Sequence, residues 1–143
     1  MIRAVLDSNV LVAGIPNSAG APADAISAWQ AAKFTLVTSE YILGEVAEAW
    51  QNRYWSSRFR AEDINAALML LRTDAEVTSF TVTVSGAAAH HHDDPVIATA
   101  ISGAASYLVT RDHALLALGN IEEVTIVSPR DFLDVLDRQK LGG

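Results

Sequence analysis

The residues best suited to chemistry are acids that follow apolar segments at four separate places in the chain. One ends the apolar run Ala4–Leu6, and the others lie in or just before segments with helical spacing. They are Asp7, Glu45, Asp93, Asp94 and Asp112. Carboxylates that lie within a few Å of one another raise each other's pKa values unless a cation keeps them ionised. Hard oxygen ligands of this kind suit Mg²⁺ or Mn²⁺, as one or two ions.

A divalent ion held by such carboxylates lowers the pKa of a bound water and stabilises the leaving oxygen of a phosphate ester. The pattern therefore indicates phosphodiester hydrolysis. Polar residues next to the acids have supporting roles in this interpretation. Ser8 and Asn9 are expected to orient Asp7. Thr110 or Arg111 is expected to bind a phosphate oxygen.

The elements around these acids alternate between strands and helices. Continuous apolar runs predict buried strands at 4–6, 34–37, 107–109 and 124–127, with a further extended segment at 75–84 near a sheet edge. Apolar residues three and four apart predict helices at 22–33, 40–50, 61–73, 95–102, 113–118 and 129 to about 138. The alternation predicts an α/β fold in which helices cover both faces of a parallel sheet of about five strands.

In such a fold each strand ends at one edge of the sheet, and the next helix begins there. Asp7 ends the first strand, and Asp112 follows a later strand. Glu45 lies in the first two turns of its helix, on the margin of the apolar stripe, whereas Glu40 and Glu48 point toward water. We therefore expect the acids to meet at the carboxyl edge of the sheet, where open α/β sheets bind ligands.

Each acid also has an ordinary structural interpretation. Asp112 can cap the helix that follows it. Pro95 suits a first helical position, which places Asp93 or Asp94 at the cap. Asp7 lacks an equally good capping role, and a charge at the end of the most buried strand is costly without a partner. The joint arrangement of the acids therefore favours a functional site more than any single acid does.

Length and composition narrow the possible classes of protein. The chain has 143 residues, half of them apolar, which fits one domain over residues 1–143 with a sizeable core. The absence of cysteine excludes disulfides, thiolate metal sites and cysteine nucleophiles. No run of about 18 apolar residues predicts a membrane span, and the amino terminus lacks a signal-peptide layout. We therefore expect a cytoplasmic protein.

The net charge of −7 argues against a broad basic surface for nucleic acid. It argues less strongly against a metal-dependent nuclease, because bound divalent ions cancel carboxylate charge. One cluster combines arginines with aromatic residues: Arg53, Arg58 and Arg60 with Tyr54, Trp55 and Phe59. Its simplest interpretation is a helix end and loop with packing aromatics, and nucleic-acid contact is the alternative. The run His90, His91 and His92 is expected to be a solvated loop, with phosphate contact or pH sensing as the alternative.

Four segments in order make the chain resemble the PIN-domain family, which comprises metal-dependent ribonucleases and includes the VapC-type toxins of toxin–antitoxin pairs. Each segment contains one acid or one pair of acids. The segments are VLDSNVLV, residues 39–45, DDPVIATA and YLVTRDHALL. Together they extend over nearly the whole chain. The resemblance is greatest to the subgroup described as toxin components of type II toxin–antitoxin systems.

This resemblance implies a three-layer α/β/α sandwich, Mg²⁺ or Mn²⁺ dependence, endonucleolytic cleavage of RNA, a homodimer, and inhibition by a small cognate antitoxin that occupies the acidic groove. The acidic quartet that it implies is Asp7, Glu45, Asp94 and Asp112. Asp94 is preferred to Asp93 because the family spacing D-x-x-[IL]-A fits Asp94, and Asp93 remains an alternative metal ligand. Arg111 stands where a small residue is common in this subgroup, which would alter how a substrate enters.

Three other functions are compatible with parts of this pattern. A haloacid-dehalogenase-type phosphatase also has an acid after its first strand, but its D-x-D pattern requires a second acid where Asn9 stands. A receiver-type signalling module has its phosphorylated Asp after a middle strand and pairs it with acids after the first, an order that this chain lacks. A non-catalytic PIN scaffold that binds RNA or a protein partner is compatible with the negative charge, although all four acids are present.

Overall fold

The computed structural model describes residues 1–80 and 94–142, and of residues 94 and 140–142 it gives the backbone alone. Within this part of the chain the strands are β1 (Arg3–Leu6), β2 (Thr35–Thr38), β3 (Glu76–Val77), β4 (Tyr107–Val109), β5 (Asn120–Ile121) and β6 (Val124–Val127). They form one six-stranded sheet in the order β3-β2-β1-β4-β6-β5. Neighbouring strands are parallel except for the antiparallel pair β5 and β6. The mostly parallel sheet is confirmed, with six strands rather than about five.

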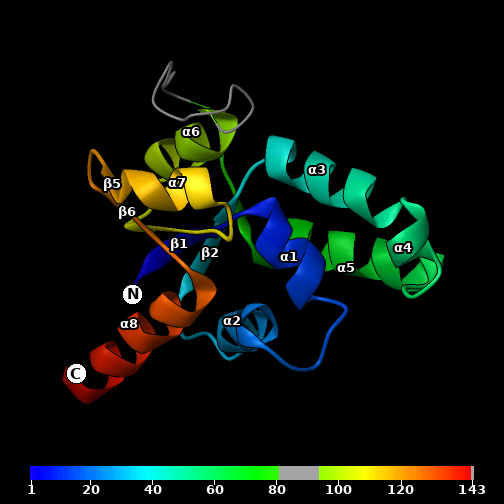
Figure 1. The fold of residues 1–143 in the computed structure, drawn as a ribbon, viewed down its shortest axis with the longest axis horizontal. Coiled ribbons are helices and arrows are strands. Elements are labelled where there is room, and N and C mark those ends of the chain that lie inside the picture. Colours follow the sequence, from blue (N-terminus) through cyan, green and yellow to red (C-terminus); the bar gives the residue numbers. More distant parts are fainter. Residues whose placement is uncertain (81–93, 143) are drawn as a thin grey trace.

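Helices flank this sheet (Figure 1). They are α1 (Ser8–Gly14), α2 (Ala21–Gln30), α3 (Glu40–Trp50), α4 (Arg53–Ser56), α5 (Ala61–Asp74), α6 (Asp94–Ser102), α7 (His113–Leu118) and α8 (Pro129–Gly142). None of the helices in the described residues is both long enough and apolar enough to cross a membrane.

Strand β2 shows why helices lie on both faces, since successive side chains of a strand point to opposite sides. Val37 faces α6, where it lies so close to Gly103 that a Cβ at that glycine would clash with it. Leu36 points the other way and lines a surface cavity together with Trp29 of α2. On that second side the ring of Phe34 packs against Phe132 of α8, with the ring centroids 4.9 Å apart. The sheet is therefore the middle layer of an α/β/α arrangement.

Strand β1 lies at the centre of the sheet, between β2 and β4. Ala4, Val5 and Leu6 are fully buried, as their unbroken apolar pattern predicts. After β1 the chain adds β2 and β3 on one side, and then crosses to add β4 and β6 on the other. The boundary between β1 and β4 is thus the point where strand order reverses, and ligands of open α/β folds bind outside the carboxyl ends of such strands.

Some elements differ from the sequence-based expectations. The apolar residues after Asn9, which lie outside the predicted elements, are buried and belong to the helix α1. Helix α4 and strand β5 were not anticipated, β3 is two residues long, and α8 continues to Gly142 instead of ending near Arg138. Helix α6 begins at Asp94, so Pro95 is its second residue. Residues 81–84 of the expected extended segment lie outside the described residues.

Candidate active site at the carboxyl edge of the sheet

Asp7 lies where the central strand β1 ends and helix α1 begins. Its backbone N–H donates a hydrogen bond to the carbonyl of Val109 at 2.9 Å, which fixes it next to the end of β4. Its Oδ1 accepts a hydrogen bond from the backbone N–H of Ser8 at 2.7 Å, so Asp7 is the N-cap of α1. The expectation that Asp7 lacks a good capping role is therefore wrong, because the helix starts immediately after the strand.

The second carboxylate oxygen of Asp7 is held by Thr110. The hydroxyl of Thr110 donates to Oδ2 of Asp7 at 2.7 Å and accepts the backbone N–H of Asp112 at 3.0 Å. The Nδ2 atom of Asn9 lies 3.5 Å from both Oδ2 of Asp7 and Oγ1 of Thr110. Thr110 is fully buried, and its hydroxyl bonds to Asp7 instead of facing the surface. Asn9 lies beside Asp7, as expected for a residue that orients the acid.

Replacing Thr110 with valine tests this positioning role. If the site carries the ribonuclease activity that the sequence resemblance implies, the variant should lose roughly 10- to 100-fold of it, the usual effect of losing a group that orients a ligand. Because the Thr110 hydrogen bond lowers the pKa of Asp7, its loss should also shift the rising limb of the pH–rate profile to higher pH. Thr110→Ser keeps the hydroxyl and should keep the profile. A valine variant with the wild-type rate and profile would show that Thr110 serves only in packing.

Glu45 reaches the same place from helix α3. This helix begins directly after β2 and is capped by Ser39, whose hydroxyl accepts the N–H of Ile42 at 3.4 Å. Glu45 is half-buried in the second turn, and its Oε1 accepts the hydroxyl of Ser8 at 3.2 Å. The same hydroxyl lies 3.5 Å from Oδ1 of Asp7. Ser8 therefore lies between the two carboxylates, although its single proton serves one of them at a time.

Asp112 approaches from the end of β4. It is the N-cap of α7, with Oδ1 accepting the N–H groups of Ala114 at 2.8 Å and Leu115 at 3.4 Å. The side chain is half-buried, and its charge acts on Asp7 by Coulomb repulsion. The capping role expected for Asp112 is present, and it leaves the acid close enough to Asp7 to affect it.

The pKa of Asp7 is raised above its ordinary value of 3.8. Burial is the main cause, because only 5% of the residue is exposed, and the neighbouring Asp112 carboxylate adds to it. Hydrogen bonds from Thr110 and Ser8 oppose the rise without cancelling it. Among the described residues, the groups that act on Asp7 are thus neutral donors and another acid. An ionised Asp7 in this position is costly until a cation compensates it.

The fourth acidic position lies at the start of α6. Gly103, just after the end of α6, accepts a hydrogen bond from Nε of Arg3 at the beginning of β1, at 3.1 Å. One turn before Gly103, toward the start of α6, the hydroxyl of Thr99 lies 2.8 Å from the hydroxyl of Ser39, the cap of α3. Helix α6 therefore runs antiparallel to β1 and begins at the carboxyl edge, where the backbone of Asp94 lies.

The side chain of Asp94, together with Asp93 and the histidines His90, His91 and His92, lies outside what the structure describes. Among the described side chains, no three His, Asp or Glu residues form a group that could hold a metal ion. The structure nevertheless links Asp7 to Glu45 through Ser8 and to Asp112 through Thr110.

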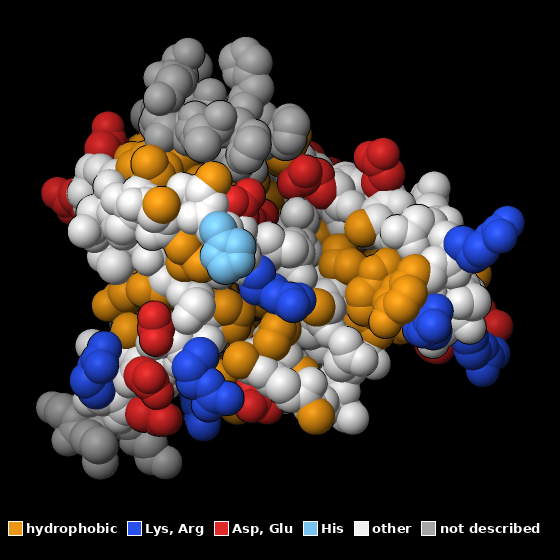
Figure 2. Space-filling view, in the orientation of Figure 1, with side chains coloured by type: hydrophobic (Ala, Val, Ile, Leu, Met, Phe, Trp, Pro, Cys, Tyr) orange, Lys and Arg blue, Asp and Glu red, His pale blue; other side chains and the backbone are white. Residues whose placement is uncertain are grey.

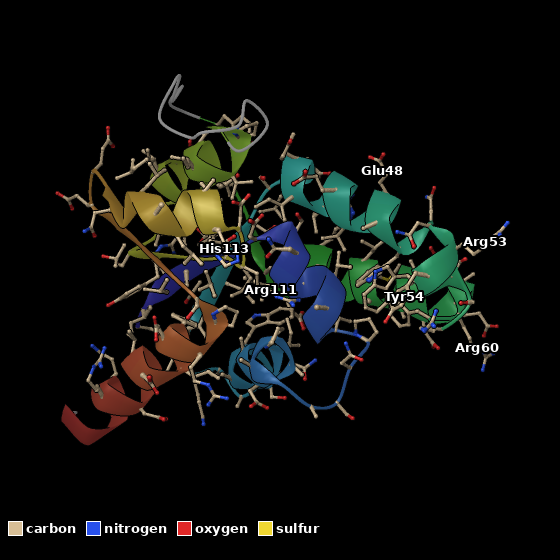
Figure 3. All side chains as sticks on the ribbon, viewed as in Figure 1. Glu48, Arg53, Tyr54, Arg60, Arg111 and His113 are labelled. Atoms are coloured by element: carbon tan, nitrogen blue, oxygen red, sulfur yellow. The ribbon has the colours of Figure 1, made fainter. Side chains whose placement is uncertain are left out.

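Two nitrogen-bearing side chains, those of Arg111 and His113, lie beside this site on the outer surface. The backbone N–H of Arg111 donates to Oδ1 of Asn9 at 3.3 Å, which leaves the Arg111 guanidinium exposed. His113, the first residue of α7, is also exposed and lies close to Arg111 on the face shown in Figures 2 and 3. Sequence reasoning named Arg111 but missed His113. Its position next to Asp112 was the available signal, since a residue that follows a capping acid lies at the same edge.

Comparison with known proteins agrees with this geometry. A family model described as the PIN domain matches residues 3–114, a segment that contains Asp7, Glu45, Asp94 and Asp112. No curated protein matches the chain. Because the family match extends over well more than half of the sequence, from β1 to the first residues of α7, the chain belongs to the PIN-domain family, whose members are generally nucleases.

Proposed function

We propose that this protein is a divalent-metal-dependent endoribonuclease that hydrolyses RNA phosphodiester bonds. The acids assigned to the site are Asp7, Glu45, Asp94 and Asp112, with Asp93 as an alternative ligand. The observation on which this proposal rests is the meeting of Asp7 and Glu45 at the hydroxyl of Ser8, with Asp112 close enough to raise the pKa of Asp7. Acids gathered at a sheet edge where strand order reverses form a site that favours a cation.

The ligand chemistry fits Mg²⁺ or Mn²⁺, as one or two ions. Carboxylate oxygens are hard ligands, and the described part of the site offers no sulfur and no buried imidazole. Asp7, Glu45 and Asp112 would hold the ion only together with an acid from the start of α6, because the described side chains do not by themselves form a group of three that could hold it. When bound, the ion would activate a water molecule and stabilise the leaving oxygen of the phosphodiester.

The remaining residues hold these acids and contact the substrate. Thr110 and the N–H of Ser8 fix the two oxygens of Asp7, so that this carboxylate is oriented before any ion arrives. Ser8 performs the same task for Glu45. The exposed guanidinium of Arg111 is placed to pair with a non-bridging phosphate oxygen, because planar donors of this type bind phosphate in a bidentate manner.

The proposal is tested by incubating the purified protein with a mixed RNA pool in Mg²⁺, in Mn²⁺ and in chelator. We expect cleavage with either metal, none in chelator, and full recovery when excess Mn²⁺ is returned. Cleavage that persists in chelator would contradict metal dependence. A folded protein that cuts no RNA in any metal would favour the non-catalytic alternative, a PIN scaffold that binds RNA or a protein.

We further propose that the protein is the toxin of a type II toxin–antitoxin pair, a cytoplasmic homodimer inhibited by a small antitoxin. The support is the similarity of the four acid-bearing segments to that subgroup. Induced expression in a bacterium, compared with the Asp7→Asn variant, measures toxicity directly. Growth arrest that depends on Asp7 would favour the toxin role, and equal growth of both strains would count against it.

A further inference from the structure

The arginine and aromatic cluster around α4 divides into an inner and an outer part. Trp55 and Phe59 face inward, where both pack against the core and the ring centroid of Phe59 lies 5.0 Å from that of the buried Trp50. Tyr54 faces outward and is 56% exposed. The interpretation as packing aromatics is confirmed for Trp55 and Phe59, but it does not account for Tyr54.

Tyr54 is held in one orientation although it is exposed. Asn52 caps α4 by accepting the N–H of Trp55 at 3.2 Å, and the Trp55 ring meets that of Tyr54 edge to face, with centroids 4.9 Å apart. The guanidinium of Arg58 lies over the Tyr54 ring, 4.0 Å from its centroid, and also donates to the Tyr54 carbonyl at 2.8 Å. Tyr54 and Arg58 thus form a stack that exists before any ligand binds.

Positive charge surrounds this stack. Arg53, Arg58 and Arg60 fall within eight residues, in a chain that has ten basic residues and a net charge of −7. Arg60 pairs with Glu62 at 2.9 Å, but both side chains are largely exposed and such pairs are weak. Glu48 on α3 points away from the Tyr54 ring (Figure 3). We call Arg53, Tyr54, Arg58 and Arg60 the arginine–tyrosine patch.

We infer that the arginine–tyrosine patch binds single-stranded RNA beside the acidic site, with a base stacked on Tyr54 and Arg58 and phosphates at Arg53 and Arg60. This inference rests on the proposed ribonuclease function. Aromatic rings and guanidinium planes are the surfaces on which unpaired RNA bases stack, and arginines pair with the phosphates between them. Figure 2 shows Lys and Arg side chains at the margin of an exposed hydrophobic patch on this side of the molecule. An apolar protein partner would leave the arginines without anionic partners, whereas the bases and phosphates of RNA match both rings and charges.

The spacing suits a single RNA strand. With a helical rise of about 1.5 Å per residue, Glu45 lies about 8 Å from the end of α3, and the patch begins within one further turn. Stacked nucleotides advance about 3.4 Å each, so the patch lies roughly three to five nucleotides from the acids. Arg111, at the acidic site, lies on the same face of the molecule as Tyr54 (Figure 3).

The test compares RNAs of about 12 and about 4 nucleotides, of which only the longer spans both places. Fluorescence polarisation in chelator measures binding of the labelled 12-nucleotide RNA without metal-dependent cleavage. We expect Tyr54→Ala to weaken this binding about tenfold, the usual effect of losing one stacked base, and Tyr54→Phe to preserve it. Arg53→Gln and Arg60→Gln, which remove the proposed phosphate contacts, should each reduce the salt slope by about 0.7. In Mn²⁺, kcat/KM should fall for the longer RNA alone.

Arg130→Gln is the matched control, because Arg130 is an exposed arginine on α8, far from α4 in Figure 1. The inference is overturned if the patch variants bind the longer RNA with the same affinity as Arg130→Gln. It is also overturned if the wild type does not bind this RNA. If the wild type cleaves RNA and the patch variants bind RNA as well as the wild type, the role of the patch is refuted and the nuclease proposal stands. Patch-dependent binding without cleavage in any metal would support the patch while the nuclease proposal fails. Far-UV circular dichroism checks that every variant is folded.

Discussion

Asp7→Asn should abolish RNA cleavage while leaving the fold intact. Asparagine has the shape of aspartate and is an equally good N-cap, so the hydrogen bond from the N–H of Ser8 can remain. What disappears is the negative charge that would anchor the metal ion. Changes to residues that merely orient a metal ligand cost 10- to 100-fold, so we expect a loss of at least about 100-fold from removing the ligand itself. The measurement is the initial rate of RNA cleavage at saturating Mn²⁺.

The stability of Asp7→Asn relative to the wild type should also change with pH in a defined direction. Because burial raises the pKa of Asp7 in the folded protein, its contribution to stability is fully present below the unfolded value and is lost as the pH rises through the folded value. In chelator, the wild type should therefore lose stability relative to Asp7→Asn as the pH increases above the ordinary value of 3.8. Thermal unfolding in chelator between about pH 4 and pH 8 measures this difference.

Adding Mn²⁺ should make the wild type more stable than Asp7→Asn, because an ion that binds only the folded wild type stabilises it. Asp134→Asn is the matched control, since Asp134 is exposed on α8 and its substitution removes the same charge. The control should cut RNA at the wild-type rate. Full activity of Asp7→Asn would refute the proposed site. A variant whose stability follows that of the wild type at every pH would show that the Asp7 carboxylate is compensated without a metal.

The elements that position the acids could be predicted because their signals are local. The run Ala4–Leu6 is apolar without alternation, as a strand covered on both faces must be. Ser39 followed by apolar residues three and four apart predicts α3, which begins and ends at the expected residues. The strand at Tyr107–Val109 likewise has its expected bounds. Since helices after parallel strands begin at one edge, these local patterns were enough to place Asp7, Glu45 and Asp112 at the same edge.

Other features depend on contacts that no local pattern contains. The hydrogen bond from Thr110 to Asp7 joins residues 103 positions apart, so the burial of the Thr110 hydroxyl could not be foreseen. Strand β5 pairs with β6 through a tight turn at Glu122 and Glu123, where Glu122 has a φ of +51°. Such turns are usually marked by Asn-Gly or Asp-Gly, and a Glu-Glu pair gives no such signal. The sheet therefore has a strand that the sequence did not reveal.

Asp7 shows the limit of judging one residue at a time. From the sequence, Asp7 was placed at the end of a strand without a good capping role, so the cap of α1 was not recognised. The cap alone would make Asp7 ordinary. Its second oxygen, held by a hydroxyl from the neighbouring strand, and its raised pKa are what distinguish it from a simple cap. The site is therefore defined by the joint use of both oxygens, which only the folded chain displays.

Trp50→Ala should be among the most destabilising single substitutions in this protein. Trp50 is fully buried at the end of α3, and its Nε1–H donates to the carbonyl of Val12 in α1 at 3.2 Å. Its ring also packs edge to face against Phe59, with centroids 5.0 Å apart. Removing a buried tryptophan usually costs about 3–5 kcal/mol, a large part of the roughly 5–15 kcal/mol that holds a domain folded.

The consequence should reach the acidic site, because Trp50 joins the helix that positions Glu45 to the helix that Asp7 caps. Urea unfolding measures the loss of free energy, and RNA cleavage at a temperature where the variant remains folded measures the effect on the site. Trp55→Ala is a suitable comparison, since Trp55 is half-buried and should cost less. A Trp50→Ala protein within about 1 kcal/mol of the wild type would contradict the expectation for a filled core position. A destabilised variant with normal cleavage would show instead that the contact of Ser8 with Glu45 holds the acids without help from the α1–α3 packing.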